Sequence, residues 1–381
     1  MSAEIEPFHA ISINTLAHDL RREGRSIVQV AFGQPSTGAP AAAIAAAHAA
    51  LDSDVGGYWE SPQLRDRIAR HYREQYGVEI EGRQVILTCG ASPALVLAMA
   101  AAFSPGDRIA TARPGYVSYR NNARALHLEP VEIPCGPEAR FQVTAKAIAD
   151  LDPAPQGLII ASPANPTGTI IEPDELAAIA KVCRERNIRI VSDEIYHGLS
   201  YVGRARSILE FEPTALVVNS FSKYFSMVGW RLGWLVAPPD LMARARAYVG
   251  NFYLTAPSLS QHAGLAAMDC REELDGHLQT YRRNRDVLLA ALPKLGLSEI
   301  APPDGAFYIY ADVSHLTDDS LAFCERMLRE VGVACAPGVD FDPVDGRHFI
   351  RLSFASATAE IEEAVRRLIP WFAEQDALAP A

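Results

Sequence analysis

The sequence predicts an α/β fold, in which a large domain is built on a mainly parallel sheet and a smaller α+β domain packs against it. Through the middle of the chain, apolar runs rich in β-branched residues alternate with helical patterns, which is typical of βαβ units in a parallel sheet. From about residue 281 the pattern changes to a long helix followed by alternating strands and helices. We therefore expect the large domain at residues 36–285, and the small domain at residues 1–35 and 286–381.

Six segments of the large domain have the length and composition of strands. Several are uninterrupted apolar runs, as expected for strands that are covered on both faces. The six segments are Val85–Thr88, Arg108–Thr111, Leu158–Ala161, Ile188–Ser192, Leu216–Asn219 and Leu232–Ala237.

Helices between these strands begin at recognisable signals. Ser61 and Pro62 supply an N-cap and a first-turn proline before Leu64–Tyr76. The acids of Pro173–Glu175 precede Leu176–Arg186 and lie where the positive end of a helix dipole favours negative charge. Both segments are therefore predicted helices.

The last hundred residues predict the small domain. A strand at Phe307–Ala311, a helix at Leu321–Val331 and a strand at His348–Phe354 precede a final amphipathic helix. Its apolar residues follow the i, i+3, i+4, i+7 spacing of one buried helical face. They are Ile361, Ala364, Val365, Leu368 and Phe372.

Charge and composition exclude several classes of partner. The 381 residues include 46 acids and 35 bases, for a net charge of −11. No basic run suits a phosphate backbone, so we expect no nucleic-acid partner. The amino terminus carries acids where a signal peptide needs positive charge, and no apolar stretch of about 18 residues follows. We therefore expect a cytoplasmic protein without a membrane partner.

The cysteines predict neither disulfides nor a metal site. They lie far apart, with no Cys-x-x-Cys and no metal-ligand spacing with histidine. Free buried thiols are the expected state for a long cytosolic chain. The six are Cys89, Cys135, Cys183, Cys270, Cys324 and Cys335.

One of the four lysines stands apart from the others. Lys146 and Lys181 fall on polar helix positions, and Lys294 lies beside a glycine at a helix end. Lys223 instead lies among hydroxyls and aromatic rings, just after the predicted strand Leu216–Asn219. Partial desolvation there would lower the pKa of the amine and free it to form an imine with a carbonyl group.

The neighbours of this lysine suit a phosphate. Ser220 and Ser222 can donate hydroxyl hydrogen bonds, and Arg231 offers a planar fork that matches phosphate geometry. Gly229 and Gly233 let the backbone pass close by. Taken alone, the segment could also be a surface turn.

With its glycines, the segment from Ser220 to Trp234 resembles the cofactor-lysine signature of class I/II aminotransferases, the fold type I pyridoxal 5′-phosphate (PLP) enzymes. Further family signatures appear in the expected order on both sides. The resemblance implies a seven-stranded, mainly parallel sheet in the large domain and PLP bound to Lys223 as a Schiff base.

Three residues resemble those that tune the cofactor ring in this family. Asp193 follows the buried strand Ile188–Ser192, at the sheet edge where sites in such folds usually lie. The matching aspartate pairs with the ring nitrogen, and the residues that match Tyr196 and Asn165 hydrogen-bond the phenolic oxygen. From the residues alone, Asp193 could merely cap a turn, and Asn-Pro-Thr-Gly is an ordinary turn.

Other residues resemble those that hold the cofactor in place. Gly90, Ala91 and Ser92 open a helix, Ala94–Phe103, whose N-terminus would face an anion, and they match the family's main phosphate cradle. A plain N-cap is the alternative. Tyr116 matches the aromatic ring that stacks on the cofactor, although a core aromatic is possible.

The resemblance also implies a homodimer with shared active sites. Tyr58, in Gly-Gly-Tyr-Trp, is similar to the tyrosine that reaches the phosphate bound by the neighbouring subunit. The expected partners are therefore a second copy of the chain and the amino acid and 2-oxo acid substrates.

Two residues resemble the family's substrate-carboxylate site. Arg351 alternates with Ile350 and Leu352 in a predicted strand, so it faces away from their apolar face. The matching arginine binds the substrate α-carboxylate through a bidentate fork, and the backbone of the glycine matching Gly33 helps hold it. Asn165 belongs to the same expected substrate site. A structural ion pair is the alternative for Arg351.

These features together predict an aminotransferase. Lys223 would act as general base, and the amino group would pass through a Lys223 aldimine and a pyridoxamine form to a 2-oxo acid. A PLP-dependent lyase or decarboxylase of the same fold is the alternative, and a non-catalytic regulatory relative is a further one. Aromatic residues suggest a neutral or aromatic substrate side chain. They are Phe32, Tyr58, Trp59 and Tyr116.

Overall fold

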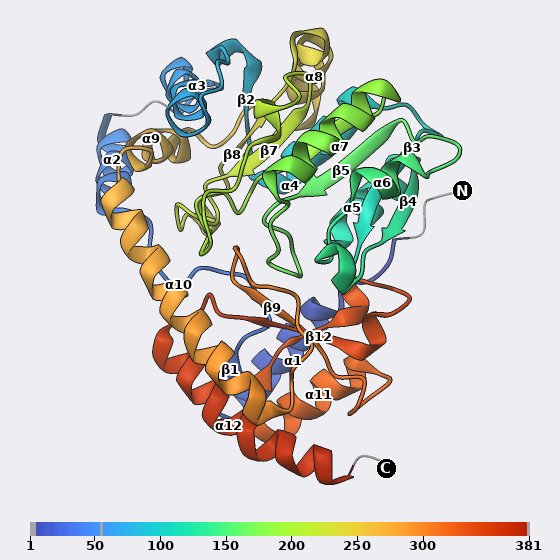
Figure 1. Cartoon of the computed structure of the whole chain (residues 1–381). Coiled ribbons are helices and arrows are strands. Elements are labelled where there is room, and N and C mark those ends of the chain that lie inside the picture. Colours follow the sequence, from blue (N-terminus) through green and yellow to red (C-terminus); the bar gives the residue numbers. More distant parts are fainter. Residues whose placement is uncertain (1–4, 54–55, 379–381) are drawn as a thin grey trace.

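A seven-stranded sheet forms the centre of the larger part of the protein (Figure 1). The computed structural model describes residues 5–53 and 56–378. The strand order is β2-β8-β7-β6-β5-β3-β4, and only β8 runs antiparallel to its neighbours. The strands are β2 (Val85–Thr88), β3 (Arg108–Arg113), β4 (Glu129–Pro134), β5 (Gly157–Ala161), β6 (Arg189–Asp193), β7 (Leu216–Ser220) and β8 (Gly233–Val236).

All six strands predicted from sequence patterns are present, with ends shifted by at most two residues. The seventh, β4, was not found from the pattern because it begins Glu-Pro and ends in Pro134. Proline cannot donate a ladder hydrogen bond, so it is tolerated in a sheet mainly at an edge. The strand lies at that edge, where it pairs with β3 alone.

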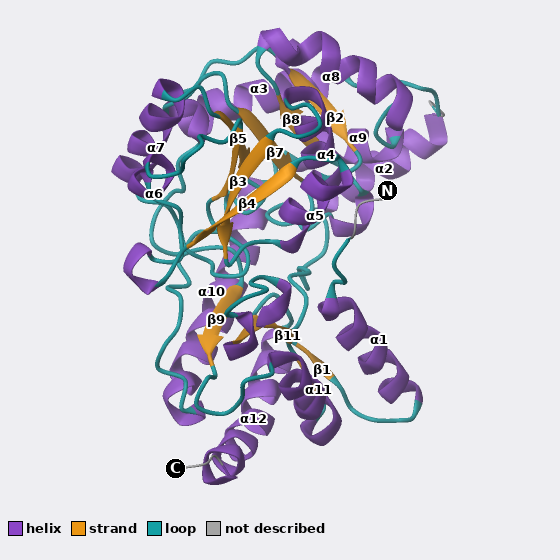
Figure 2. Cartoon of the chain, turned by 90° about the vertical axis from the view of Figure 1, so that its right-hand side faces the viewer, coloured by secondary structure: helices purple, strands orange, loops and turns teal. Residues whose placement is uncertain are grey.

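Helices cover both faces of the sheet (Figures 1 and 2). Side chains alternate along each strand, so Val217 packs in the core on one face while Leu216 and Val218 pack on the other. The first face is covered by α2 (Ala41–Ser53), α3 (Pro62–Tyr76), α6 (Ala145–Ala149), α7 (Pro173–Glu185) and α9 (Ser258–Ala267). The second is covered by α4 (Ala91–Ala102), α5 (Val117–Ala125) and α8 (Pro239–Phe252).

The predicted helix signals act as expected. The Ser61 hydroxyl accepts a hydrogen bond from the Leu64 N–H at 3.1 Å, which caps the start of α3. Asp174 and Glu175 lie in the first turn of α7. The helix begins at Pro173, three residues earlier than the apolar pattern alone indicates.

The smaller part joins the amino-terminal segment to the last hundred residues. Val28 and Gln29 pair in parallel with Val333 and Ala334, and α1 packs into the same core as α11 and α12 (Figure 1). The strands are β1 (Val28–Gln29), β9 (Tyr308–Asp312), β10 (Val333–Ala334), β11 (Ala336–Pro337) and β12 (Phe349–Ser353). The helices are α1 (His9–Arg22), α10 (Arg271–Ala291), α11 (Ser320–Val331) and α12 (Thr358–Leu378).

The domain limits at residues 35/36 and 285/286 stay a prediction. Helix α10 runs through the second limit without a break. Its Leu274 belongs to the core of the larger part, whereas Leu288 belongs to the core of the smaller part. Within the described ranges, no helix combines the length and the apolar character needed to cross a membrane.

Replacement of Leu368 by alanine tests the core of the smaller part. Leu368 is 1% exposed on the apolar face of α12, so Leu368→Ala should lower the free energy of unfolding by about 2–5 kcal/mol. Urea denaturation measures this loss. Val344→Ala is the control, because Val344 is 58% exposed and its truncation should cost about 0.5 kcal/mol or less. Equal losses in the two variants would contradict the packing described.

Candidate active site

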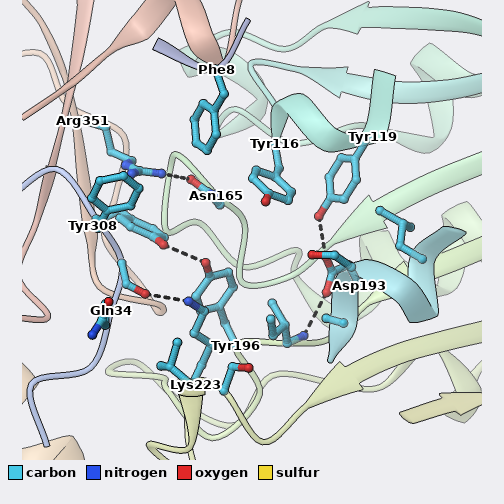
Figure 3. A pocket seen from close by; sticks show the side chains of 18 of the residues that line it. Phe8, Gln34, Tyr116, Tyr119, Asn165, Asp193, Tyr196, Lys223, Tyr308 and Arg351 are labelled. Carbon is cyan, nitrogen blue, oxygen red and sulfur yellow. Dashed lines mark hydrogen bonds between the residues drawn. The ribbon is translucent and has the colours of Figure 1, made fainter. Parts of the chain in front are cut away.

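A cavity of about 250 Å³ lies at the ends of β6 and β7, between the two parts of the protein (Figure 3). Side chains from the start of α4, from β9 and from β12 complete its wall. Eleven residues expected from the sequence line it: Gly33, Ala91, Ser92, Tyr116, Asn165, Asp193, Tyr196, Ser222, Lys223, Arg231 and Arg351. Three expected residues, Gly90, Ser220 and Tyr58, do not line the cavity.

Lys223 lines this cavity and is half-buried. Its ammonium group donates a hydrogen bond of 2.6 Å to the carbonyl oxygen of Gly33. Burial lowers the pKa of the amine to about 8, and the positive charges of Arg351 and Arg231 add to this effect. The nearby carboxylate of Asp193 acts in the opposite direction. About a tenth of the amine is therefore uncharged at pH 7, far more than for an ordinary lysine, and the uncharged amine is the form that attacks carbonyl groups.

Asp193 is the last residue of β6, and its carboxyl group is buried (Figure 3). The hydroxyl of Tyr119 donates to one carboxylate oxygen at 2.8 Å, and the N–H of Ile195 donates to the other at 3.1 Å. Burial raises the pKa of this carboxyl group to about 6, although both hydrogen bonds oppose the rise. The carboxylate is therefore oriented, and it is ionised at neutral pH.

Tyr119 was not identified from the sequence. It lies three residues after Tyr116, on the helix that Tyr116 precedes, so the two rings project from neighbouring positions. Their rings meet edge to face at 5.6 Å. This helical spacing was the available signal, but it does not distinguish a carboxylate partner from a core tyrosine.

Tyr196 contacts a second residue that the sequence did not reveal. Its hydroxyl lies 2.7 Å from that of Tyr308, the first residue of β9 (Figure 3). The Tyr308 hydroxyl also lies beside Gly33, where a Cβ atom would approach it to 1.8 Å. Residue 33 must therefore be glycine unless the tyrosine moves.

Arg351 is 2% exposed and lies between two aromatic rings. Its guanidinium carbon is 4.3 Å from the ring centre of Tyr308 and 4.6 Å from that of Phe341. One nitrogen donates to the side-chain oxygen of Asn165 at 2.6 Å, and another donates to the Ala31 carbonyl oxygen. Nε is buried and has no hydrogen-bond partner within the described chain.

Arg351 forms no ion pair with an acidic side chain of the described residues. The structural ion pair considered from the sequence is therefore absent in that part of the chain. The side chain therefore lines the cavity with a positive charge that no carboxylate of that part of the chain pairs, and its Nε donor is unpaired, which suits an anionic ligand.

The expected phosphate cradle lies at the start of α4. Gly90 has φ +104° and precedes the helix, whose first residues are Ala91 and Ser92. A Cβ atom at position 90 would approach Nη2 of Arg231 to 2.5 Å. That guanidinium group donates to the Cys89 carbonyl oxygen at 3.2 Å. The absence of a side chain at position 90 thus lets the arginine lie against the helix start.

The serines before Lys223 fix this loop. The Ser220 hydroxyl is 2.9 Å from that of Ser222 and 2.9 Å from the carbonyl oxygen of Leu232. Only Ser222 reaches the cavity. Ser220 therefore supports the loop from behind.

The aromatic residues fall into two groups. Tyr116 and Phe32 line the cavity, and so does Phe8, which the sequence did not indicate. Trp59 stacks on His262 at 5.3 Å outside it, and Tyr58 is 87% exposed. Of the four aromatic residues that the sequence suggested around the substrate, Phe32 and Tyr116 therefore line the cavity of this chain, whereas Tyr58 and Trp59 do not.

The fold and the site together define an aminotransferase. The family described as aminotransferase class I and II matches residues 25–368, and the chain belongs to this family, whose members use PLP. The enzyme transfers an amino group from an amino acid to a 2-oxo acid.

Among the relatives is a valine–pyruvate aminotransferase of Mycobacterium tuberculosis, which is 47% identical over 98% of both chains. An aspartate/prephenate aminotransferase of Thermus thermophilus is 32% identical over 95% of both chains. The crystal structure of an aminotransferase from M. tuberculosis superposes with a TM-score of 0.95 at 47% identity, covering 97% of both chains. The Thermus thermophilus aspartate aminotransferase with maleate gives 0.90 at 31% identity, covering 96% and 97%.

Replacement of Asp193 by asparagine should stabilise the cofactor-free protein in a pH-dependent way. The pKa of this carboxyl group is about 6 when folded and 3.8 ordinarily, so the folded state binds the proton more tightly. Its contribution to stability therefore falls as the pH rises through this window and stays low above it. An asparagine side chain there could accept from the Ile195 N–H and donate to the Tyr119 hydroxyl oxygen, without a charge to desolvate. At pH 8, Asp193→Asn should be more stable than the wild type by roughly 2–3 kcal/mol.

Urea denaturation of the cofactor-free proteins at pH 8 and pH 4.5 measures this difference, which should shrink at the lower pH. Asp318→Asn is the matched control, because Asp318 is exposed and its replacement should produce no such trend. A difference that grows toward low pH would disprove the assignment of burial as the cause.

Proposed function

We propose that this aminotransferase binds PLP on Lys223 and uses the same amine to move the substrate proton. The observation that carries the proposal is a half-buried lysine, with its pKa lowered to about 8, in a cavity whose other charged residues are Asp193, Arg231 and Arg351. Three bases against one acid favour a ligand with more than one negative charge. A phosphorylated aldehyde together with an amino acid carboxylate meets this requirement.

The residues present fit PLP. Ser222, Arg231 and the N–H groups at the start of α4 would hold the phosphate. Asp193 would pair with the ring nitrogen, while Tyr196 and Asn165 would donate to the phenolic oxygen. Tyr116 would stack against the ring. When bound, PLP supplies an aldehyde for the amine and a ring that accepts electrons from the substrate carbon.

Lys223 is suited to proton transfer at that carbon. Burial and two nearby arginines favour the neutral amine, so it can accept a proton near neutral pH and return it at an adjacent position. Tyr119 orients Asp193 through its hydrogen bond of 2.8 Å, and the ionised carboxylate would stabilise positive charge on the ring nitrogen.

Arg351 supports transfer over decarboxylation. With Asn165 and the backbone of Gly33 beside it, its free donor would retain the substrate carboxylate. A decarboxylase, in which the carboxylate leaves, needs no such retention.

We also propose an amino acid substrate with an uncharged side chain. Each basic residue of the cavity wall already has a role: Lys223 supplies the amine, Arg231 would bind the phosphate and Arg351 the α-carboxylate. No basic lining residue therefore remains for a second carboxylate. Phe8, Leu95 and Ile195 give the wall an apolar character. The relative named a valine–pyruvate aminotransferase supports the same class.

The catalytic unit we propose is a homodimer. Tyr58 is 87% exposed, shortly before α3 begins, and it could reach a phosphate bound in a second copy of the chain. Sedimentation of the purified protein as a single chain would rule the dimer out.

Removal of the lysine amine tests the central proposal. Lys223→Ala should lack the visible absorbance of bound PLP and lose activity by about 10⁴-fold or more. Borohydride reduction of the wild type, followed by peptide mapping, should label residue 223. Lys181→Ala, an exposed helical position, is the control and should behave as the wild type. If residue 223 stays unlabelled while PLP is bound, the proposal fails.

The half-reaction tests both reaction type and substrate. Valine or alanine added without a 2-oxo acid should convert the bound cofactor to its amine form, at least tenfold faster than aspartate does. Carbon dioxide release with the original spectrum retained would indicate the decarboxylase instead.

Arg351→Lys should raise KM for valine by roughly 10- to 100-fold, because it loses charge-assisted hydrogen bonds. Arg282→Lys, outside the cavity, should not.

A further inference from the structure

We propose that Tyr308 is a positioning residue with two separable parts, a hydroxyl that strengthens the donor Tyr196 and a ring that holds Arg351. The inference rests on the proposed function, because it concerns how the chain tunes the PLP-loaded site. Tyr308 lines the cavity at the start of β9. It contacts both Tyr196 and Arg351, and its hydroxyl lies beside Gly33.

The hydroxyl of Tyr308 lies 2.7 Å from that of Tyr196 (Figure 3). A phenol has a single O–H to donate, but its oxygen can also accept. If Tyr196 donates to the phenolic oxygen of PLP, the bond between the two tyrosines must run from Tyr308 to Tyr196. Burial raises the pKa of Tyr308 above its ordinary value, so this donor keeps its proton over the working pH range.

A donated bond of this kind strengthens the next one in the chain. Hydrogen bonds in series polarise one another, so Tyr196 becomes a better donor when its own oxygen accepts. Negative charge on the phenolic oxygen would be stabilised further, and the basicity of the Lys223 nitrogen, once joined to the cofactor, would fall. The hydroxyl of Tyr308 therefore helps set the pH at which that nitrogen loses its proton.

The ring of Tyr308 has a different partner. The guanidinium carbon of Arg351 lies 4.3 Å from the ring centre, within the range of a cation–π contact. Phe341 lies 4.6 Å from the same carbon. The two rings hold the planar guanidinium in one orientation, which leaves Nε free of protein partners. This contact needs the ring but not the hydroxyl.

Tyr310, two residues further along β9, provides a matched comparison. It is also buried, but its hydroxyl has no hydrogen-bond partner within the described residues. Its ring stacks on Phe349 at 4.7 Å, and Tyr310 itself does not line the cavity. Loss of its hydroxyl therefore tests the general effect of removing a buried phenol oxygen from this strand.

The experiment compares Tyr308→Phe, Tyr308→Leu and Tyr310→Phe with the wild type, each loaded with PLP. The first readout is the midpoint pH of the visible absorbance change. The second is the split between kcat and KM for valine.

In Tyr308→Phe the midpoint should rise by roughly 0.5–1 pH unit, while KM stays within about twofold of the wild type. In Tyr308→Leu the midpoint should rise similarly, and KM should increase about five- to tenfold because the cation–π contact is lost. Tyr310→Phe should change neither quantity.

The outcomes separate this inference from the proposed function. If the wild type shows no visible band from a Lys223-bound cofactor, the proposed function itself fails. If the wild-type band titrates but Tyr308→Phe titrates at the same pH, the role of the hydroxyl is overturned alone. Equal increases of KM in the Phe and Leu variants would overturn the role of the ring. Should Tyr308→Leu fail to fold, the KM of Tyr308→Phe still tests the role of the ring. Any increase beyond twofold would contradict the assignment of Arg351 binding to the ring alone.

Discussion

The constraint on which the site depends is the gathering of three positive groups beside a single carboxylate in the wall of one cavity. Lys223, Arg231 and Arg351 would repel one another in a cavity of about 250 Å³. Each is held by a backbone carbonyl oxygen, from Gly33, Cys89 and Ala31 respectively. Carbonyl dipoles stabilise these cations without neutralising them. The cavity therefore keeps an excess of positive charge, which lowers the pKa of Lys223 and favours anionic ligands.

Two of the three carbonyls come from one short segment between β1 and α2. Ala31 and Gly33 hold Arg351 and Lys223, so this segment joins a cation on the smaller part to a cation on the larger part. It can pass between them because residue 33 has no side chain, and the Tyr308 hydroxyl occupies that space. The geometry of the site thus depends on how the two parts pack as well as on either sheet.

Tyrosines in the cavity wall support the other residues of the site. Tyr119 orients Asp193, and Tyr308 contacts Tyr196 while its ring lies against Arg351. Phenols are suited to this role, because each combines a rigid apolar ring with one donor and stays protonated when buried. Two of the three expected ring-tuning residues, Asp193 and Tyr196, thus act with a tyrosine from a different element.

The sequence by itself determined most of the sheet, the family and most of the residues that line the cavity. The strands could be predicted because strands covered on both faces must be apolar along their length. Lys223 and Arg231 could be identified because they lie in one contiguous motif. Asp193 could be identified because it directly follows a predicted buried strand. Edge strand β4 was missed, since its prolines are tolerated only where a neighbouring strand is absent.

Only the tertiary structure decided which residues support these groups. Tyr119 is 74 residues from Asp193, and Tyr308 is 112 residues from Tyr196. No local period or cap distinguishes such tyrosines from core aromatic residues. Nor could the sequence say that Arg351 lacks an acidic partner among the described residues, or that Trp59 lies outside the cavity. A side chain's partners, and hence its charge state, depend on the packing of segments that are distant along the chain.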